Sequence, residues 1–273
     1  MSKLIQGPFA VLMTPFVGEK IDEEAFVAQI KMINETDICG FVSNGSTAEY
    51  IHLSLEEQMH MSELTANHKA KDKKLIVSAC TGNVADTVKL CRHAGKIGAD
   101  AVLVCPPYYF KYPECEREEY FKQVADLSPV PVVLYSVPFF TQEIELDLVF
   151  RLLEHKNIVG IKDSSANMKC LMHMAEYTNG KDVSIMTGTD DILISALVGG
   201  CVGSLTAFAA IYPREIAALY AAVNAGDMKK AKEIQYSLMP KLRRADAYTF
   251  PHGYKKLMAE EVGYAFNDKE VSE

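Results

Sequence analysis

The chain has 273 residues, of which 49% are hydrophobic, so it can bury one large core or two smaller ones. Its formal net charge of −8 argues against nucleic acid or an anionic membrane as the main partner. No apolar run approaches the roughly 18 residues that a membrane helix needs, and we expect no signal peptide. The seven cysteines follow neither C-x-x-C nor zinc-site spacing, which predicts reduced thiols in a cytoplasmic protein without a metal site.

Short apolar runs rich in β-branched residues recur along the chain, and each predicts a strand. They are FAVLMTPF from residue 9, GFVSNG from 40, LIVSAC from 75, AVLVCPP from 101, VPVVLYSV from 130, IVGIKDS from 158, VSIMTGT from 183 and CVGSLTA from 201. Segments with helical spacing lie between them, such as 22–35 and 53–68, and in the second Ser54 and Glu57 form a capping-box pattern. Many of the strands lack polar alternation, as expected of a parallel sheet that is covered on both faces.

The repeated order of strand and helix predicts a (β/α)8, or TIM, barrel over residues 1–224 that carries the functional site. Residues 225–273 contain two further helical patterns and no strand signal, which predicts a helical extension packed on the barrel. A doubly wound open sheet is the alternative fold, but the chain has no G-x-G-x-x-G after the first strand.

Lys162 is unusual because it lies inside an apolar strand, in the stretch NIVGIKDSS (157–165). A closed barrel has no edge strand that a charge would protect, and alternation places Lys162 on the face of Ile158 and Gly160, near the carboxyl end of the strand. Burial disfavours an ammonium relative to a free amine, and a free amine attacks ketones. The alternative is a structural lysine that reaches water past the strand end or pairs with Asp163.

Three further polar segments are expected at the same end of the barrel. Tyr135 ends the neighbouring strand, about 4.8 Å away, where a phenol can exchange protons with an amine. Ser46 and Thr47 follow the second strand and suit a small carboxylate, with a helix-entry loop as the alternative. Tyr108 and Tyr109 follow the fourth strand, and adjacent tyrosines in a loop commonly serve packing or an interface.

Four motifs, in their order and spacing, resemble the dihydrodipicolinate synthase and N-acetylneuraminate lyase family of Schiff-base aldolases. They are GSTAE at 45–49, PYY at 107–109, LYSVP at 134–138 and GIKDS at 160–164. The resemblance implies that Lys162 forms a Schiff base with pyruvate or another 2-oxo acid and that Tyr135 moves the protons. It also implies that Ser46 and Tyr109 complete a hydroxyl relay, with Tyr109 supplied across a dimer interface.

By the same resemblance, Ser46 and Thr47 hold the carboxylate of the 2-oxo acid, and the backbone carbonyl of Gly203 faces the site. A homotetramer built from two dimers, with no metal or organic cofactor, is typical of the family. TGTDD at 187–191 resembles the acidic pair with which sialic acid lyases bind sugar hydroxyls, so Asp190 is expected to bind substrate. The alternative for these aspartates is a place at the positive end of a helix dipole.

The chain departs from the family pattern at three positions. Phe140 stands where synthases carry the arginine that grips the carboxylate of the aldehyde, Thr87 stands where lysine-inhibited synthases have a glutamate, and Ala48 replaces a glycine. The leading hypothesis is therefore a class I aldolase or lyase that joins or releases pyruvate and an aldehyde, and acts on 4-hydroxy-2-oxo or 2-keto-3-deoxy acids. The alternatives are a 4-hydroxy-tetrahydrodipicolinate synthase, which condenses pyruvate with aspartate semialdehyde, and a non-catalytic ketoacid-binding regulator.

Overall fold

The computed structural model describes residues 5–269, and eight parallel strands within this range form a closed barrel. In barrel order they are β1 (Gly7–Val11), β4 (Gly40–Ser43), β5 (Lys74–Ser78), β6 (Ala101–Val104), β7 (Val132–Ser136), β8 (Ile158–Asp163), β9 (Ser184–Thr187) and β10 (Gly203–Thr206). Nearly all of their residues are buried, in agreement with the missing polar alternation. The predicted (β/α)8 barrel with a C-terminal helical part is confirmed, and each of the predicted strands is present.

The described residues fall into two compact units. Unit 1 contains residues 5–7 and 76–205, and unit 2 contains residues 8–75 and 206–269. Lys162 and Tyr135 belong to unit 1, whereas Ser46 and Thr47 belong to unit 2.

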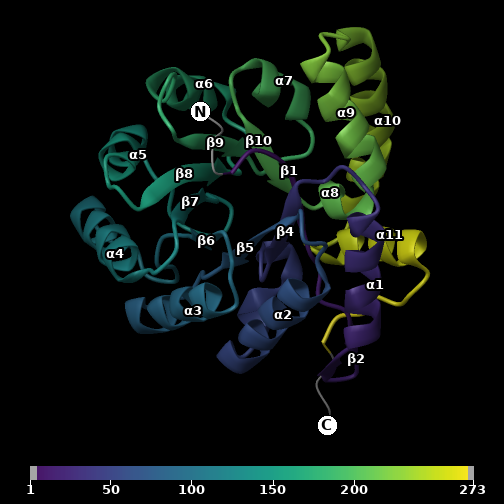
Figure 1. The fold of residues 1–273 in the computed structure, drawn as a ribbon, viewed down its shortest axis with the longest axis horizontal. Helices are drawn as coiled ribbons and strands as arrows, with labels where there is room; N and C mark the ends of the chain where they lie inside the picture. Colours follow the sequence, from purple (N-terminus) through teal and green to yellow (C-terminus); the bar gives the residue numbers. More distant parts are fainter. Residues whose placement is uncertain (1–4, 270–273) are drawn as a thin grey trace. The chain divides into compact units, whose positions relative to one another are not determined.

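In unit 1, each helix follows a strand of the barrel. The helices are α3 (Val84–Lys96), α4 (Glu114–Leu127), α5 (Leu146–Leu153), α6 (Met168–Tyr177) and α7 (Leu193–Val198). Figure 1 shows α4, α5 and α6 on the outer side of the strands β6, β7 and β8. Asparagine side chains cap two of the helices, because Asn83 accepts a hydrogen bond from the Asp86 N–H and Asn167 accepts one from the Cys170 N–H.

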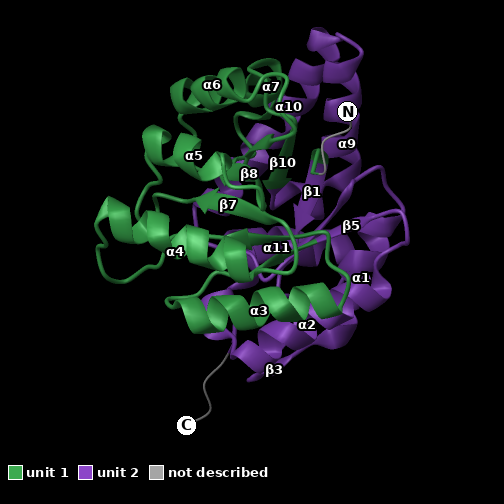
Figure 2. Cartoon of the chain, turned by 60° about the vertical axis from the view of Figure 1, so that its left-hand side comes forward, with its two compact units in different colours: residues 1–7, 76–205 green, residues 8–75, 206–273 purple. Residues whose placement is uncertain are grey.

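In unit 2, shown in purple in Figure 2, helices come from both ends of the chain. They are α1 (Glu23–Asn34), α2 (Leu55–His68), α8 (Phe208–Ile211), α9 (Pro213–Asn224), α10 (Met228–Asp246) and α11 (His252–Val262). The first helix lies within the predicted helical segment 22–35 and buries Phe26, Ile30 and Ile33. Ser54 and Glu57 form the predicted capping box at the start of α2.

Unit 2 also contains a small hairpin that the sequence pattern does not reveal. Its strands, β2 (Phe16–Val17) and β3 (Lys20–Ile21), have two residues each, too few to show an alternation. Asn267, beyond α11, forms an isolated bridge with Phe16 of this hairpin. The C-terminal segment is thereby fastened to residues near the start of the chain.

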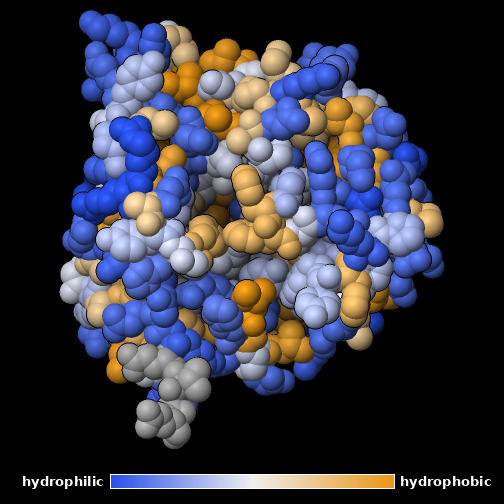
Figure 3. Space-filling view, turned by 180° about the vertical axis from the view of Figure 1, so that it is seen from behind, coloured by the Kyte–Doolittle hydropathy of each residue, from blue (hydrophilic) through white to orange (hydrophobic). Residues whose placement is uncertain are grey.

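The surface is mixed in character. On the face drawn in Figure 3, hydrophilic residues predominate and apolar residues are scattered among them. Among residues 5–269, no helix is both long enough and apolar enough to cross a membrane.

Gly160 lies where β8 passes very close to β9, and the substitution Gly160→Ala tests this packing. An added Cβ would lie 3.1 Å from the carbonyl carbon of Ser184 and nearer still to its oxygen, so one strand would have to move. We expect a loss of about 1 to 3 kcal/mol in the free energy of unfolding, measured by chemical denaturation. Gly82→Ala is the matched control, since a Cβ there meets nothing within 4 Å, and equal losses in both variants would contradict the prediction.

Candidate active site

Lys162 and Tyr135 lie side by side near the carboxyl ends of two neighbouring strands. Backbone pairing sets Tyr135 of β7 opposite Lys162 of β8. Both residues are only 4% exposed, and the Lys162 Nζ lies 4.2 Å from the centre of the Tyr135 ring, within the range of a cation–π interaction. The predicted proximity of amine and phenol is confirmed, and the alternative of a lysine that reaches water is wrong.

A bulge in β8 precedes Lys162. Ile158 and Gly160 pair with two consecutive residues of β7, so Val159 is an extra residue without a partner on that strand. Such bulges change the face that the following residues present, and they recur next to active sites. The alternation counted from Ile158 is therefore wrong across Val159, and the regular pairing that includes Lys162 begins at Gly160.

Gly188, in the loop after β9, leaves the space that the Lys162 side chain occupies. A Cβ at this position would lie 2.5 Å from the Lys162 Cε and nearer still to the Ser164 hydroxyl oxygen. The Gly188 N–H also donates a hydrogen bond of 2.7 Å to the carbonyl of Asp163. Nothing in the sequence distinguishes Gly188 from an ordinary turn glycine, so this role emerges only from the structure.

Two buried thiols, Cys80 and Cys105, follow β5 and β6. The Cys105 N–H donates to the Cys80 sulfur at 3.2 Å, and the Cys80 thiol donates to the Leu103 carbonyl at 3.6 Å. Burial acts to raise the pKa of the Cys80 thiol, but hydrogen bonds from Cys105 and Ser78 and the charge of Lys162 outweigh it and lower the pKa. The cysteine pattern predicts a reduced thiol at this position, but it does not predict that the thiol lies in the electrostatic field of Lys162.

Asp163 directly follows Lys162 at the end of β8. Its carboxylate accepts hydrogen bonds from the N–H and the hydroxyl of Ser165, at 3.0 and 2.5 Å. Burial raises the pKa of the Asp163 carboxyl above its ordinary value, and the hydrogen bonds from Ser165 offset this effect only in part. The ionised form of Asp163 is therefore disfavoured in the folded protein.

Ser46 and Thr47 lie in unit 2, in the short 3-10 turn η1 (Ser46–Ala48) that follows β4. Thr47 is buried and Ser46 is partly exposed. The next helix, α2, is capped by Ser54, so neither hydroxyl of the turn serves as the cap of that helix. Capping of α2 is therefore not the reason for a serine and a threonine at these positions.

Tyr109 and Phe140 lie in two exposed loops of unit 1. Tyr109 is 91% exposed, with φ at 80°, and its ring meets the Phe110 ring edge-on with centroids 5.0 Å apart. Phe140 is 55% exposed and lies beside the more exposed Phe139 in the turn after β7. In the single chain, Tyr109 therefore does not share the burial of Lys162 and Tyr135.

The remaining predicted site residues, Gly203 and Asp190, lie in and next to the last two strands of the barrel. Gly203 begins β10, and a Cβ there would lie 2.5 Å from the carbonyl oxygen of Gly7, so the close approach of the backbones requires glycine. Asp190 is buried in the loop between β9 and α7. Asp190 and Asp191 directly precede Ile192, which occupies the N-cap of α7 without a side-chain hydrogen bond, so the alternative of a place near the start of this helix stays open.

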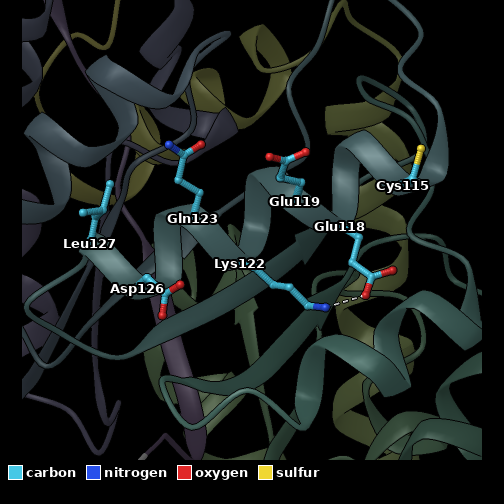
Figure 4. Close-up of a pocket in the computed structure, with 7 residues that line it drawn as sticks. All are labelled: Cys115, Glu118, Glu119, Lys122, Gln123, Asp126 and Leu127. Atoms are coloured by element: carbon cyan, nitrogen blue, oxygen red, sulfur yellow. Dashed lines mark hydrogen bonds and ion pairs between the residues drawn. The ribbon is translucent and has the colours of Figure 1, made fainter.

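A separate hollow of about 650 Å³ runs along α4 (Figure 4). It is lined by Cys115, Glu118, Glu119, Lys122, Gln123, Asp126 and Leu127. The ammonium of Lys122 is bound to the carboxylate of Glu118 at 2.7 Å, and none of the lining residues is buried. This hollow lacks a desolvated reactive group, so the Lys162 and Tyr135 pair remains the candidate active site.

Comparison with known proteins places the chain in a family. The sequence model described as the Dihydrodipicolinate synthetase family matches residues 4–267. The chain belongs to this family. The 4-hydroxy-tetrahydrodipicolinate synthase of Methanothrix thermoacetophila is 32% identical over 250 residues, which cover 91% of this chain and 84% of that protein. The predictions of the family and of an enzyme of the lyase class are thereby confirmed.

Solved structures agree with this assignment. The 4-hydroxy-tetrahydrodipicolinate synthase of Methylacidiphilum fumariolicum SolV superposes with a TM-score of 0.92 at 29% identity, over 98% of this chain and 91% of that one. A prophage protein of the dihydrodipicolinic acid synthase family from E. coli K12, solved in complex with pyruvate, gives a TM-score of 0.91 at 26% identity, over 99% of this chain and 94% of that one. These two solved structures thus share this barrel over almost the whole chain.

Asp163→Asn is expected to stabilise the protein at neutral pH but not at low pH. The pKa of this carboxyl is higher in the folded than in the unfolded chain, so the folded state binds more protons between the two pKa values. The contribution of Asp163 to the free energy of unfolding is therefore fully present below the pKa of the unfolded chain. It falls as the pH rises from that pKa through the higher pKa of the folded protein. Asparagine does not ionise and can still accept from Ser165.

Thermal unfolding of both proteins at about pH 3 and at pH 7 measures this effect. We expect similar midpoints for the two proteins at the lower pH and a higher midpoint for Asp163→Asn at pH 7. A wild-type protein that is the more stable of the two at pH 7 would show that the Asp163 carboxylate is favoured in the folded state.

Proposed function

We propose that the chain is a class I aldolase or lyase in which Lys162 forms an imine with pyruvate or another 2-oxo acid. The observation that carries the proposal is the Lys162 amine, buried beside Tyr135 at the end of the barrel where such enzymes place their catalytic groups. The amine attacks the keto carbon and water leaves, so the protonated imine withdraws electrons from the neighbouring carbon. Loss of a proton there gives an enamine that adds to an aldehyde, and the reverse sequence cleaves the same carbon–carbon bond.

In this proposal, the other polar residues bind the substrate and move protons. Tyr135 exchanges protons with the imine and the new hydroxyl, and Ser46 and Tyr109 extend the relay. The hydroxyls of Ser46 and Thr47 hold the carboxylate of the 2-oxo acid. The carbonyl of Gly203 faces the same site, and Asp190 binds a hydroxyl of the aldehyde portion. No cofactor takes part, since the imine itself acts as the electron sink.

The assembly is part of the proposal. The 91% exposure of Tyr109 supports a role in the site of a second subunit, within a homotetramer built from two such dimers. The proposed catalytic barrel spans residues 1–224 and the proposed helical extension residues 225–273, of which residues 1–4 and 270–273 lie outside the described part of the chain. The free thiols support a cytoplasmic location.

Phe140 supports a partner aldehyde that carries no carboxylate of its own. A phenyl ring cannot form the bidentate, charge-assisted contact that an arginine makes with a carboxylate. We therefore favour 4-hydroxy-2-oxo or 2-keto-3-deoxy acids as substrates. The names of the relatives support the alternative, a synthase that condenses pyruvate with aspartate semialdehyde.

Regulation by lysine is not part of the proposal. Thr87, at the position where lysine-inhibited synthases carry a glutamate, is fully buried. Its hydroxyl lies 2.7 Å from that of Thr81 and 3.0 Å from that of Tyr120, so it forms hydrogen bonds within the interior of unit 1.

Borohydride added with pyruvate is expected to attach one reduced pyruvate to each chain, at Lys162. Intact mass and peptide mapping measure the adduct, because borohydride reduces an imine to a stable amine. Lys162→Ala should abolish it, whereas Tyr135→Phe keeps the amine and should still be labelled. Lys181→Ala is the matched control, since Lys181 also lies over a tyrosine ring, at 3.7 Å from that of Tyr177, but is exposed. An adduct that persists in Lys162→Ala would refute the proposal.

Phe140→Arg is expected to shift the preference between aldehydes. The wild-type protein should condense pyruvate poorly with aspartate semialdehyde and better with a hydroxylated aldehyde, and the arginine should improve use of the semialdehyde about ten- to a hundredfold relative to the other. Steady-state kinetics of both proteins with both aldehydes give the ratio. Efficient semialdehyde turnover by the wild type would make the synthase the better assignment, and pyruvate labelling without turnover of any aldehyde would favour a ketoacid-binding regulator.

A further inference from the structure

Lys255, on α11 of unit 2, is a fully buried lysine held between two carboxylates. Its Nζ lies 2.5 Å from Glu49 and 3.1 Å from Asp268, and the side chain has no exposed surface. We infer that Lys255 is a positioning residue, which holds Glu49 and thereby fixes the adjacent turn of Ser46 and Thr47 in the conformation that takes the carboxylate of a 2-oxo acid. This inference rests on the proposed function and adds a residue from the far end of the sequence to it.

The backbone of the turn explains why it needs anchors. Asn44 and Glu49 flank the turn, and both have φ in the left-handed region, at 57° and 55°. Asparagine tolerates this region better than glutamate does, because its short side chain can hydrogen-bond locally. Glu49 therefore adopts an unfavourable conformation for its residue type, and such a conformation persists only where the surroundings hold it.

The anchors come from two different helices. The Asn44 side-chain amide donates to the Gln58 carbonyl at 2.8 Å and to the Ser62 hydroxyl at 2.9 Å, both on α2. The Glu49 carboxylate is bound to Lys255 on α11. The turn thus begins at a residue tied to one helix and ends at a residue tied to another.

Hydrogen bonds within unit 2 carry the position of Glu49 into the turn. The Glu49 N–H donates to the Ser46 carbonyl at 3.0 Å, so a rotation at Glu49 moves Ser46 directly. The carbonyl of Ala48, between them, accepts a hydrogen bond of 2.9 Å from the Thr14 hydroxyl. Thr14 is therefore a second, independent support of the same turn.

The burial of Lys255 distinguishes its ion pairs from those on the surface. An ammonium without water is costly unless charged partners surround it, and removal of one partner leaves the other uncompensated. Asp268 is further fixed by His252, whose Nδ1 lies 2.7 Å from its carboxylate. By contrast, Arg244 on α10 and Glu260 on α11 form an ion pair in which each side chain is more than half exposed.

The test compares wild type with Lys255→Met in the full-length protein, and pyruvate is the probe. Borohydride labelling at increasing pyruvate concentration gives the half-saturating value, and amide hydrogen exchange reports on residues 45–53. We expect the half-saturating concentration to rise about tenfold or more, since small displacements of a binding group weaken a site to this extent. The label should still map to Lys162, and faster exchange should be confined to the turn and its immediate neighbours. Glu260→Gln, the matched control on the same helix, should leave both readouts unchanged.

A double variant separates the charge pair from simple packing. Glu49→Gln alone should also raise the half-saturating pyruvate concentration, because it leaves Lys255 without its nearest countercharge. In Lys255→Met combined with Glu49→Gln, neither uncompensated charge remains at this contact, so the two effects should be clearly less than additive. Strict additivity would overturn the ion pair as the anchor.

If Lys255→Met does not fold, Glu49→Gln and Thr14→Val decide, because each weakens one support of the turn and changes little volume. Folded variants that bind pyruvate like the wild type, with unchanged exchange in the turn, would refute the inference. A wild-type protein that is not labelled by pyruvate at all would instead overturn the proposed function.

Discussion

The register between β7 and β8 is the constraint on which the candidate site depends, because it sets Tyr135 directly opposite Lys162. A slip of one residue would turn one of the two side chains to the other face of the sheet. The extra residue Val159 and the close contact of Gly160 with β9 both lie just before this pair, where they hinder such a slip. Gly188 then provides the room in which the lysine side chain extends.

Much of the fold can be predicted from the sequence because the patterns that specify its strands and helix starts are local. The β-branched runs predict the strands, and Ser54 with Glu57 predicts the start of α2, since each pattern acts within a few residues. The hairpin of β2 and β3 cannot be predicted in this way, because strands of two residues are too short to show an alternation of apolar and polar residues. The bulge at Val159 is equally hidden, since it is defined by the pairing with β7 and not by the sequence of β8 itself.

The residues of the candidate site likewise include some that the sequence predicts and some that only the structure reveals. Lys162 stands out because an ammonium inside an apolar strand conflicts with its surroundings, and Tyr135 follows from the neighbouring strand. Cys80 lies in the electrostatic field of Lys162, and Gly188 leaves room for the Lys162 side chain. Both relations act through space, so the sequence around Cys80 and Gly188 does not indicate them. Lys255 looks like an ordinary charge in the helical pattern KKLMAEE, and only the packing of α11 shows that it is buried.

The contact of Glu49 with Lys255 joins residues that are 206 positions apart, and this separation bears on how the protein is made. A ribosome delivers the chain from its N-terminus, and the parts that emerge first begin to fold first. A nascent chain that ends after α9 has already presented Asn44 and its support on α2, yet it lacks the partner of Glu49. The Glu49 anchor of the turn therefore forms only when translation is almost complete, and a chain that stops before Lys255 would keep every strand of the barrel and the supports at Asn44 and Thr14 but would lack this anchor.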